Sequence, residues 1–160
     1  MKGRPVRITS LELTDAAAVR APSRPAPPGL TVARSHAPEL NRLLYATIGQ
    51  DFHWTDRLPW TAEQWRRHEA SVQTQVATLG GQTAGYYELR ERDGSVEVVI
   101  FGLLKHARGL GIGGHLLVHA LRLALQLAPR VWLHTCTDDG PHALANYRAR
   151  GLQIFDVRAA

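Results

Sequence analysis

The sequence contains a single cysteine in 160 residues. Cys136 therefore has no partner for an internal disulfide, and zinc sites of the ribbon type, which need several cysteines, are excluded. The histidines form no HExxH motif, and we expect no metal site. No stretch approaches the ~18–20 consecutive apolar residues that span a bilayer, and the first residues lack the apolar core of a signal peptide. We expect a cytoplasmic protein with no membrane partner.

Acidic residues are also few: 14 Asp and Glu stand against 19 Lys and Arg, which gives a net charge of +5 and a pI near 10.0. A basic surface suits any polyanion, including nucleic acid or a phosphorylated cofactor. The basic residues are scattered and form no recognisable nucleic-acid-binding motif, so we do not expect nucleic acid as a partner. The apolar content of 44% and charged content of 21% are ordinary for one globular domain of this length.

Glycine is concentrated in one place, the segment HARGLGIGGHLL from His106 to Leu117. Glycine adopts positive φ freely and lets a ligand approach the backbone closely. A long apolar stretch follows at once and predicts a helix, whose first N–H groups have no partner within the helix and carry a partial positive charge. The segment therefore predicts a cradle for an anion.

Two familiar phosphate-binding motifs do not fit this segment. Gly109, Gly111 and Gly114 satisfy GxGxxG, but hairpin strands precede them and too few residues follow for a dinucleotide-binding fold. A P-loop is excluded because His115 stands where a lysine is required.

Hydrophobic periodicity and turn residues predict four helices and seven strands. The helices cover Ala37–Ile48, Ala62–Glu69, Ile112–Ala128 and Pro141–Arg150; the strands cover Val6–Leu13, Leu30–Arg34, Gln73–Leu79, Thr83–Leu89, Val96–Leu104, Val131–Cys136 and Gln153–Val157. We expect the first of these strands to lie at an edge of the sheet. Residues 1–29 are expected to form this strand and an Ala/Pro-rich connector, and residues 30–160 the main domain.

The pattern Arg108-x-x-Gly111-x-Gly113, after a strand and at the start of a helix, resembles the acyl-CoA signature of the GNAT acetyltransferase superfamily. The tail HALANYRARGLQ is similar to the last helix of that family, and the order of elements is similar throughout. The resemblance implies an α/β (α+β) GNAT fold. Its central sheet is mixed and mostly antiparallel, splays apart between two central strands, and is flanked by about four helices.

The resemblance further implies an N-acetyltransferase that moves an acetyl group from acetyl-CoA to a primary amine of unknown identity by direct attack. The pantetheine arm of CoA would enter between strands 96–104 and 131–136, which a bulge near Gly102 would force apart. The residues expected to contact CoA are Leu103, Arg108, Gly109, Leu110, Gly111, Ile112, Gly113 and Gly114.

Transfer to an amine needs a base, because an alkylammonium is neutral in only about one molecule in 2,500 at pH 7. Glu97 falls where the histone-modifying branch of the family carries its glutamate, and Glu88 is the second choice. Tyr147 matches the family's tyrosine and would donate a proton to the departing thiolate.

The acceptor side is less well marked in the sequence. The aromatic-rich loop DFHWTDRLPW, residues 51–60, lies where the family's first two helices roof the acceptor pocket. Trp54 and Asp56 in this loop, together with Glu88, are the expected acceptor contacts. We expect a small-molecule or peptide amine as the partner, and a homodimer is compatible with the sequence.

Two features depart from the family pattern. Gly140 stands where the family often has Asn, and the chain ends too soon after Val157 for the usual final strand. Segment 6–13 or a second subunit would then supply that strand. Two other function classes stay open: a non-catalytic acyl-CoA-binding module on the same fold, and a basic nucleic-acid-binding domain.

Overall fold

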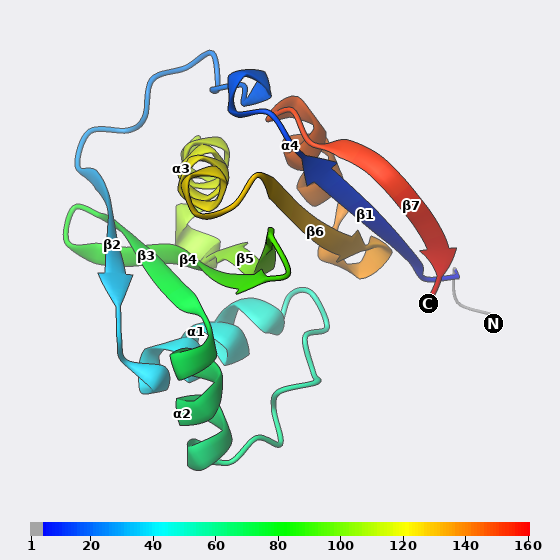
Figure 1. The fold of residues 1–160 in the computed structure, drawn as a ribbon. Coiled ribbons are helices and arrows are strands. Elements are labelled where there is room, and N and C mark those ends of the chain that lie inside the picture. The colour runs from blue at the N-terminus through cyan, green and yellow to red at the C-terminus, as the bar shows by residue number, and fades with distance from the viewer. Residues whose placement is uncertain (1–4) are drawn as a thin grey trace.

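The computed structural model describes residues 5–160, and these form one seven-stranded sheet with helices on both faces (Figure 1). The strands run in the order β2-β3-β4-β5-β6-β1-β7. Their bounds are β1 Arg7–Leu13, β2 Leu30–Ser35, β3 Gln73–Leu79, β4 Gln82–Arg92, β5 Ser95–Leu103, β6 Arg130–Cys136 and β7 Gln153–Ala159. The helices are α1 Pro38–Gly49, α2 Ala62–Ser71, α3 Ile112–Leu127 and α4 Pro141–Ala149, with three short 3-10 turns, η1 Ala16–Ala18, η2 Lys105–Ala107 and η3 Thr137–Asp139.

The mixed, mostly antiparallel sheet and its four flanking helices confirm the predicted fold class. Every predicted helix and strand is present, with bounds that differ by at most three residues. Within residues 5–160, no helix combines the length and the apolar character needed to cross a bilayer.

The helices divide between the two faces of the sheet. In Figure 1, α3 and α4 lie above the sheet and α1 and α2 below it. Neighbouring side chains on β4 show the same division, because Tyr87 packs into the core under α3 whereas Tyr86 packs against α1 and α2. Both tyrosines are fully buried, so the sheet carries an apolar layer on each face.

The position of β1 corrects the expectation of an edge strand. β1 lies inside the sheet, antiparallel to β6 on one side and to β7 on the other. Leu11 and Leu13 alternate along it and pack with Val131 and Leu133 of β6 in the core under α3 and α4. Segment 6–13 thus joins the sheet, as the first of the two alternatives requires.

β5 and β6 are the two central strands that part. They run parallel and pair at only three positions, Ser95 with Arg130, Val96 with Val131 and Glu97 with Trp132. β5 continues to Leu103 and β6 to Cys136 with no further partners between them. The predicted splay is therefore confirmed.

The bulge that accompanies this splay lies at Val99, and the expected position near Gly102 is wrong. Glu88 of β4 faces Ile100 and Leu89 faces Val98, which leaves Val99 without a partner. Gly102 is paired with Tyr86 of β4, and its lack of a side chain leaves room for two neighbouring side chains. A Cβ atom there would lie 2.9 Å from the side chain of Ile48 and 3.0 Å from that of Trp54.

Truncation of Leu11 to alanine tests whether β1 belongs to the core. Leu11 has no exposed surface, so Leu11→Ala is expected to lower the free energy of unfolding by about 2–5 kcal/mol in chemical denaturation. Val157→Ala, at an exposed position on neighbouring β7, is the control and is expected to change it by less than about 0.5 kcal/mol. Equal losses in the two variants would contradict the central position of β1.

Candidate functional site

The glycine turn opens α3 without any cap from a side chain. Gly109 and Gly111 have φ of 77° and 79°, a region that L side chains rarely adopt. Gly111 is the N-cap, it provides no side-chain hydrogen bond, and the first turn of α3 holds no acidic residue. The first N–H groups of α3 are thus free to hold an anion, as the sequence predicts.

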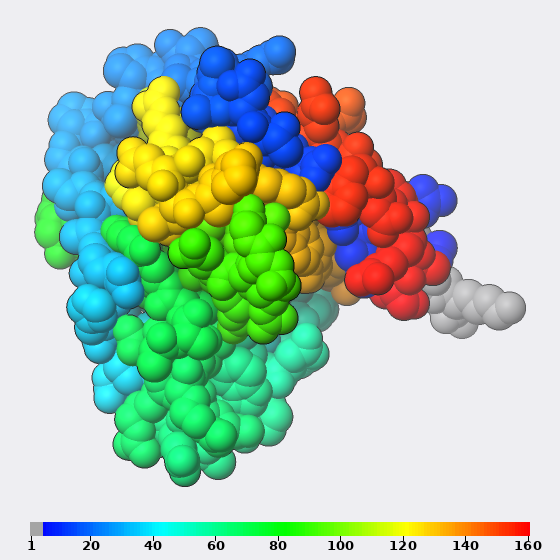
Figure 2. All heavy atoms as spheres, in the orientation of Figure 1, coloured from blue at the N-terminus to red at the C-terminus, as the bar shows by residue number. Residues whose placement is uncertain are grey.

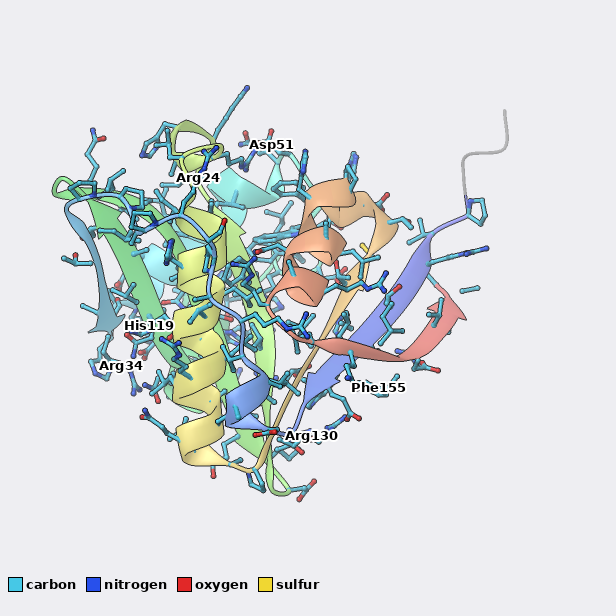
Figure 3. All side chains as sticks on the ribbon, turned by 90° about the horizontal axis from the view of Figure 1, so that it is seen from above. Arg24, Arg34, Asp51, His119, Arg130 and Phe155 are labelled. Carbon is cyan, nitrogen blue, oxygen red and sulfur yellow. The ribbon has the colours of Figure 1, made fainter. Side chains whose placement is uncertain are left out.

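The Ala/Pro-rich connector crosses the beginning of α3. His115 shares a hydrogen bond of 2.8 Å with the carbonyl oxygen of Arg24. A Cβ atom on Gly114 would lie 2.7 Å from Pro22, so glycine is needed there for the close approach of the connector. Figure 3 shows Arg24 and Asp51 at the end of the molecule where α3 starts.

Arg150 places a second cation beside this turn. Its Nη1 lies 3.0 Å from the position of a Cβ on Gly114, and its Nε and Nη1 are buried with no hydrogen-bond partner among residues 5–160. Sequence reasoning missed both arginines near the turn: Arg24 lies in the Ala/Pro-rich connector, which has no recognisable motif, and Arg150 lies in the tail HALANYRARGLQ, where only its closeness in the fold to the glycine turn reveals a role.

Arg108 ties the turn to the loop of residues 51–60. Its Nη1 forms an ion pair of 2.8 Å with Asp51, and its guanidinium lies 4.7 Å from the centre of the Phe52 ring. Its Nε donates to the carbonyl oxygen of Leu103 at the end of β5, 3.1 Å away. Arg108 therefore fixes the open end of the gap between β5 and β6.

Tyr147 of α4 lies on the α3 side of the same gap. Its ring packs edge-on against Phe101 of β5, with the ring centres 6.3 Å apart. Burial, and then the carboxylate of Asp139, raise the pKa of Tyr147 above its ordinary value of 10.0. The hydroxyl group is consequently a stable proton donor at neutral and moderately alkaline pH.

Trp54 reaches from the 51–60 loop to the end of β6. Its Nε1 donates to Oδ1 of Asp139, 3.3 Å away, while Oδ2 of Asp139 accepts from Oγ1 of Thr135 at 2.7 Å and from the backbone N–H of Cys136 at 3.0 Å. Through Asp139 the loop is thus joined to the end of β6, as it is joined to the end of β5 through Arg108. Asp139 is a site residue that the sequence analysis missed.

The residue after Asp139 explains one departure from the family pattern. Gly140 has φ of 85° and ψ of 164°, a conformation that is open in practice only to glycine. An asparagine at this position would strain the backbone.

Cys136 at the end of β6 is poorly suited to carry an acyl group. Burial, and then the carboxylate of Asp139, raise the pKa of its thiol. Because the thiolate is the nucleophilic form, this environment suppresses its reactivity.

Glu88 of β4 lies in a buried polar cluster under α1 and α2. Its carboxylate has no exposed surface and contacts three elements. Oε1 lies 3.0 Å from Nη1 of Arg57 and 2.7 Å from Nε2 of His68, and Oε2 accepts from Nδ2 of Asn41 at 2.7 Å. Glu88 thereby links the sheet to α1, to the 51–60 loop and to α2.

The electrostatics of the cluster keep Glu88 ionised. Burial alone would raise the pKa of Glu88, but the hydrogen bond from His68 and the positive charge of Arg57 outweigh it, and the pKa lies below the ordinary 4.5. The guanidinium of Arg57 in turn lies 5.2–5.9 Å from the ring centres of Tyr45, Trp60 and Trp65. A carboxylate so enclosed lacks the exposed surface that an acceptor contact or a base needs.

Glu97 has the opposite environment. It lies on the face of the sheet opposite α3 and lines an open cavity of about 520 Å³. Glu97 and Trp132 are the last paired residues before β5 and β6 part, and both line this cavity. The cavity therefore begins where the gap ends, and no described residue forms an ion pair with Glu97. Asp56, the other expected acceptor contact, is exposed on the 51–60 loop.

The histidines of α3 do not form a metal site, although His115 and His119 have HxxxH spacing. His115 bonds the connector, whereas Nδ1 of His119 lies 2.6 Å from the hydroxyl group of Tyr87. In the part of the chain that the structure describes, no group of three or more potential ligands could hold a metal ion.

Comparison with known proteins gives one family. The model of the acetyltransferase (GNAT) family matches residues 38–152. A comparison with curated proteins found no significant match.

Solved structures agree on the fold. A GCN5-related N-acetyltransferase from Kribbella flavida aligns with 97% of this chain at a TM-score of 0.68 and 22% identity. An IAA acetyltransferase from Bacillus cereus aligns with 79% of this chain at a TM-score of 0.61 and 25% identity. A tandem GNAT protein from the clavulanic acid biosynthesis pathway aligns with 99% of this chain at a TM-score of 0.63 and 16% identity. The chain spans 58%, 79% and 53% of these three proteins.

Removal of the Glu88 charge tests the buried cluster. Glu88→Gln leaves Arg57 buried without its counter-charge, and we expect a loss of about 3 kcal/mol in the free energy of unfolding by urea denaturation. Glu91→Gln, at an exposed position on the same strand, is the control and should change it by less than about 0.5 kcal/mol.

The stability difference between wild type and Glu88→Gln should also depend on pH. Because the pKa of Glu88 is lower in the folded state, its stabilisation is complete above the ordinary value of 4.5 and is lost as pH falls through the lowered value. The stability difference between wild type and Glu88→Gln should therefore shrink in acid. A difference that is constant from pH 7 to pH 3 would show that the carboxylate charge does not stabilise the fold.

Proposed function

From the premise that the chain belongs to the acetyltransferase (GNAT) family, we propose that it transfers an acetyl group from acetyl-CoA to a primary amine. The observation that carries the proposal is the gap between β5 and β6. It has an uncapped helix start at its open end, Tyr147 along one side, and a cavity with Glu97 at its closed end.

The residues at the gap fit a CoA thioester. The N–H groups at the start of α3 hold the pyrophosphate, and the positive φ of Gly109 and Gly111 leaves their backbone open on the side of the ligand. The guanidinium of Arg150, which lies beside Gly114, adds positive charge for the phosphates, and Arg24 lies on the connector that crosses the start of α3. Between β5 and β6, unpaired backbone groups are available to the amides of the pantetheine arm, as in the addition of a strand.

CoA supplies an acetyl group activated as a thioester. The chain must orient it, take a proton from the amine and return one to the sulfur. Glu97 faces the cavity and accepts the proton of the ammonium group, which leaves the nitrogen lone pair free to attack the thioester carbon. A C–N bond forms and the C–S bond breaks. The hydroxyl group of Tyr147 donates its proton to the leaving sulfur, and the second proton that the nitrogen loses as the amide forms returns to the Tyr147 oxygen.

The arrangement also assigns roles to the residues beside the gap. Glu88 holds Arg57, and so the 51–60 loop, in place from within the core. Trp54 in that loop forms the wall of the gap on the acceptor side through its bond to Asp139. Acceptor positioning thus depends on the loop, and proton transfer on Glu97 and Tyr147.

Gly111→Ala tests the anion cradle. The substitution strains a residue at φ of 79°, and we expect it to weaken CoA binding tenfold or more in isothermal titration calorimetry. Gly94→Ala, at φ of 77° in the hairpin between β4 and β5, imposes the same strain away from the turn and should leave CoA affinity unchanged. Equal CoA affinities of Gly111→Ala and Gly94→Ala would contradict phosphate binding at the glycine turn.

Tyr147→Phe and Glu97→Gln test the chemistry. Each is expected to lower amine-dependent release of free thiol from acetyl-CoA by about 100-fold while CoA affinity is kept. Tyr87→Phe, which alters another buried tyrosine of raised pKa, is the control. Since burial raises the pKa of Tyr147, the wild-type rate should not decline between pH 7 and pH 9. Tight CoA binding with no thiol release on any amine would favour a non-catalytic acyl-CoA-binding module.

A further inference from the structure

The cavity beside Glu97 is built from five neighbouring strands. Its lining includes Arg90, Glu97, Arg130, Trp132 and Phe155, from four of these strands. Figure 2 shows the hairpin between β4 and β5 on one side of this region and β7 on the other, with β6 and β1 between them. Its volume of about 520 Å³ is in the range of sites for small molecules.

Three of these side chains form one row across the sheet. Arg90 of β4 is paired with Glu97 of β5, and Glu97 is paired with Trp132 of β6. All three line the cavity, so they project from the same face. Directly paired residues on neighbouring strands have Cβ atoms about 5 Å apart. A cation, an anion and an aromatic ring therefore follow one another at the closed end of the gap.

The charges of this row are available to a ligand. Among residues 5–160, Arg90 makes two long side-chain contacts, 3.4 Å to His68 and 3.4 Å to Ser71, and both use the same nitrogen atom. Glu97 forms no ion pair with any of residues 5–160. Arg130, by contrast, is already paired with Glu12 at 2.6 Å.

The aromatic part of the cavity is formed by Trp132 and Phe155. The guanidinium of Arg130 lies 5.9 Å from the ring centre of Trp132 and 5.1 Å from that of Phe155, so it fixes the two rings relative to each other. Phe155 is the bulged residue of β7 and is nearly half exposed. Figure 3 places Arg130 and Phe155 at the end of the molecule opposite the start of α3.

The charges of the cavity favour an acceptor that carries both signs. Four arginines face the carboxylates of Asp93, Glu97 and Asp156, and Arg130 is neutralised by Glu12, so cations and anions balance. A polyamine or an aminoglycoside would bring several positive charges without a partner for most of them, and would leave Arg90 without a counter-charge. An acceptor with a negative charge beside its amine provides that counter-charge.

We propose that the acceptor is an α-amino acid with an aromatic side chain. Its α-amine lies at Glu97, its carboxylate binds Arg90, and its ring packs on Trp132. The order of the three protein groups matches the order of the three ligand groups. The assignment rests on the proposed acetyl transfer, because it identifies Glu97 as the group that receives the amine proton.

Matched acceptors test the assignment through the release of free thiol from acetyl-CoA. L-phenylalanine is expected to exceed phenylalaninamide and phenethylamine, which lack the carboxylate charge, by tenfold or more in kcat/KM. It should exceed alanine, which lacks the ring, by a similar factor, and spermidine should be the poorest acceptor. A higher kcat/KM for phenethylamine or spermidine than for L-phenylalanine would overturn the proposal.

Variants locate the binding groups. Arg90→Gln should lower kcat/KM for L-phenylalanine at least tenfold and leave phenylalaninamide unchanged, and Arg90→Lys should restore part of the loss. A merely structural Arg90 would reduce both acceptors equally, which would contradict the proposal. Trp132→Ala should raise KM for L-phenylalanine but not for alanine. Arg66→Gln, on the exposed surface of α2, is the control.

A binding measurement tests the acceptor assignment separately from the proposed acetyl transfer. In calorimetry with CoA present, N-acetyl-L-phenylalanine should bind at least tenfold more tightly than N-acetyl-L-phenylalaninamide, and Arg90→Gln should abolish the difference. Equal affinities overturn the acceptor assignment even if acetyl transfer occurs. The expected preference without thiol release on any amine would support the assignment of the cavity and count against catalysis.

Discussion

The parting of β5 and β6 is the feature on which the rest of the structure depends. Two parallel strands at the centre of a sheet normally satisfy each other's backbone groups along their whole length, and leaving them unpaired has a cost. Here pairing stops after Glu97 and Trp132, and the bulge at Val99 follows immediately. The unpaired groups are available to an extended chain of amides, and this is why the proposed site joins the gap to the glycine turn and the cavity.

The 51–60 loop beside the gap is held by polar contacts with three other elements. The 51–60 loop has no regular structure, but Arg57 anchors it to Glu88 inside the core, Asp51 anchors it to Arg108 at the turn, and Trp54 anchors it to Asp139. Three attachments to three different elements fix a loop that hydrogen bonds of its own backbone would leave mobile. The cluster around Glu88 thus holds the loop from within the core, and the proposed positioning of an acceptor depends on that support.

Sequence patterns predicted what depends on local signals. Glycines next to an apolar stretch marked the turn and α3, and the tail around Tyr147 marked α4. The central location of β1 was missed, because its partners β6 and β7 are more than a hundred residues away and the sequence of β1 does not indicate which strands it pairs with. The bulge at Val99 lies in a uniform run of β-branched residues, and no residue type there signals it. Glu88 gave no sign of full burial because its three partners come from separate segments, and the row from Arg90 to Trp132 emerges only from the register of β4, β5 and β6.

Hydrogen–deuterium exchange with and without CoA tests the central claim most directly, because it reports on the backbone groups of the gap. Residues 99–103 also pair with β4 and residues 133–136 with β1, so the informative amides are those that face the gap. The account predicts that these amides exchange readily in the free protein and become protected on addition of CoA, together with those at the start of α3. Amides in β2 and β3, on the far side of the sheet, should not change. Protection of the gap-facing amides in the free protein, or no change in them on addition of CoA, would contradict a thioester arm bound between β5 and β6.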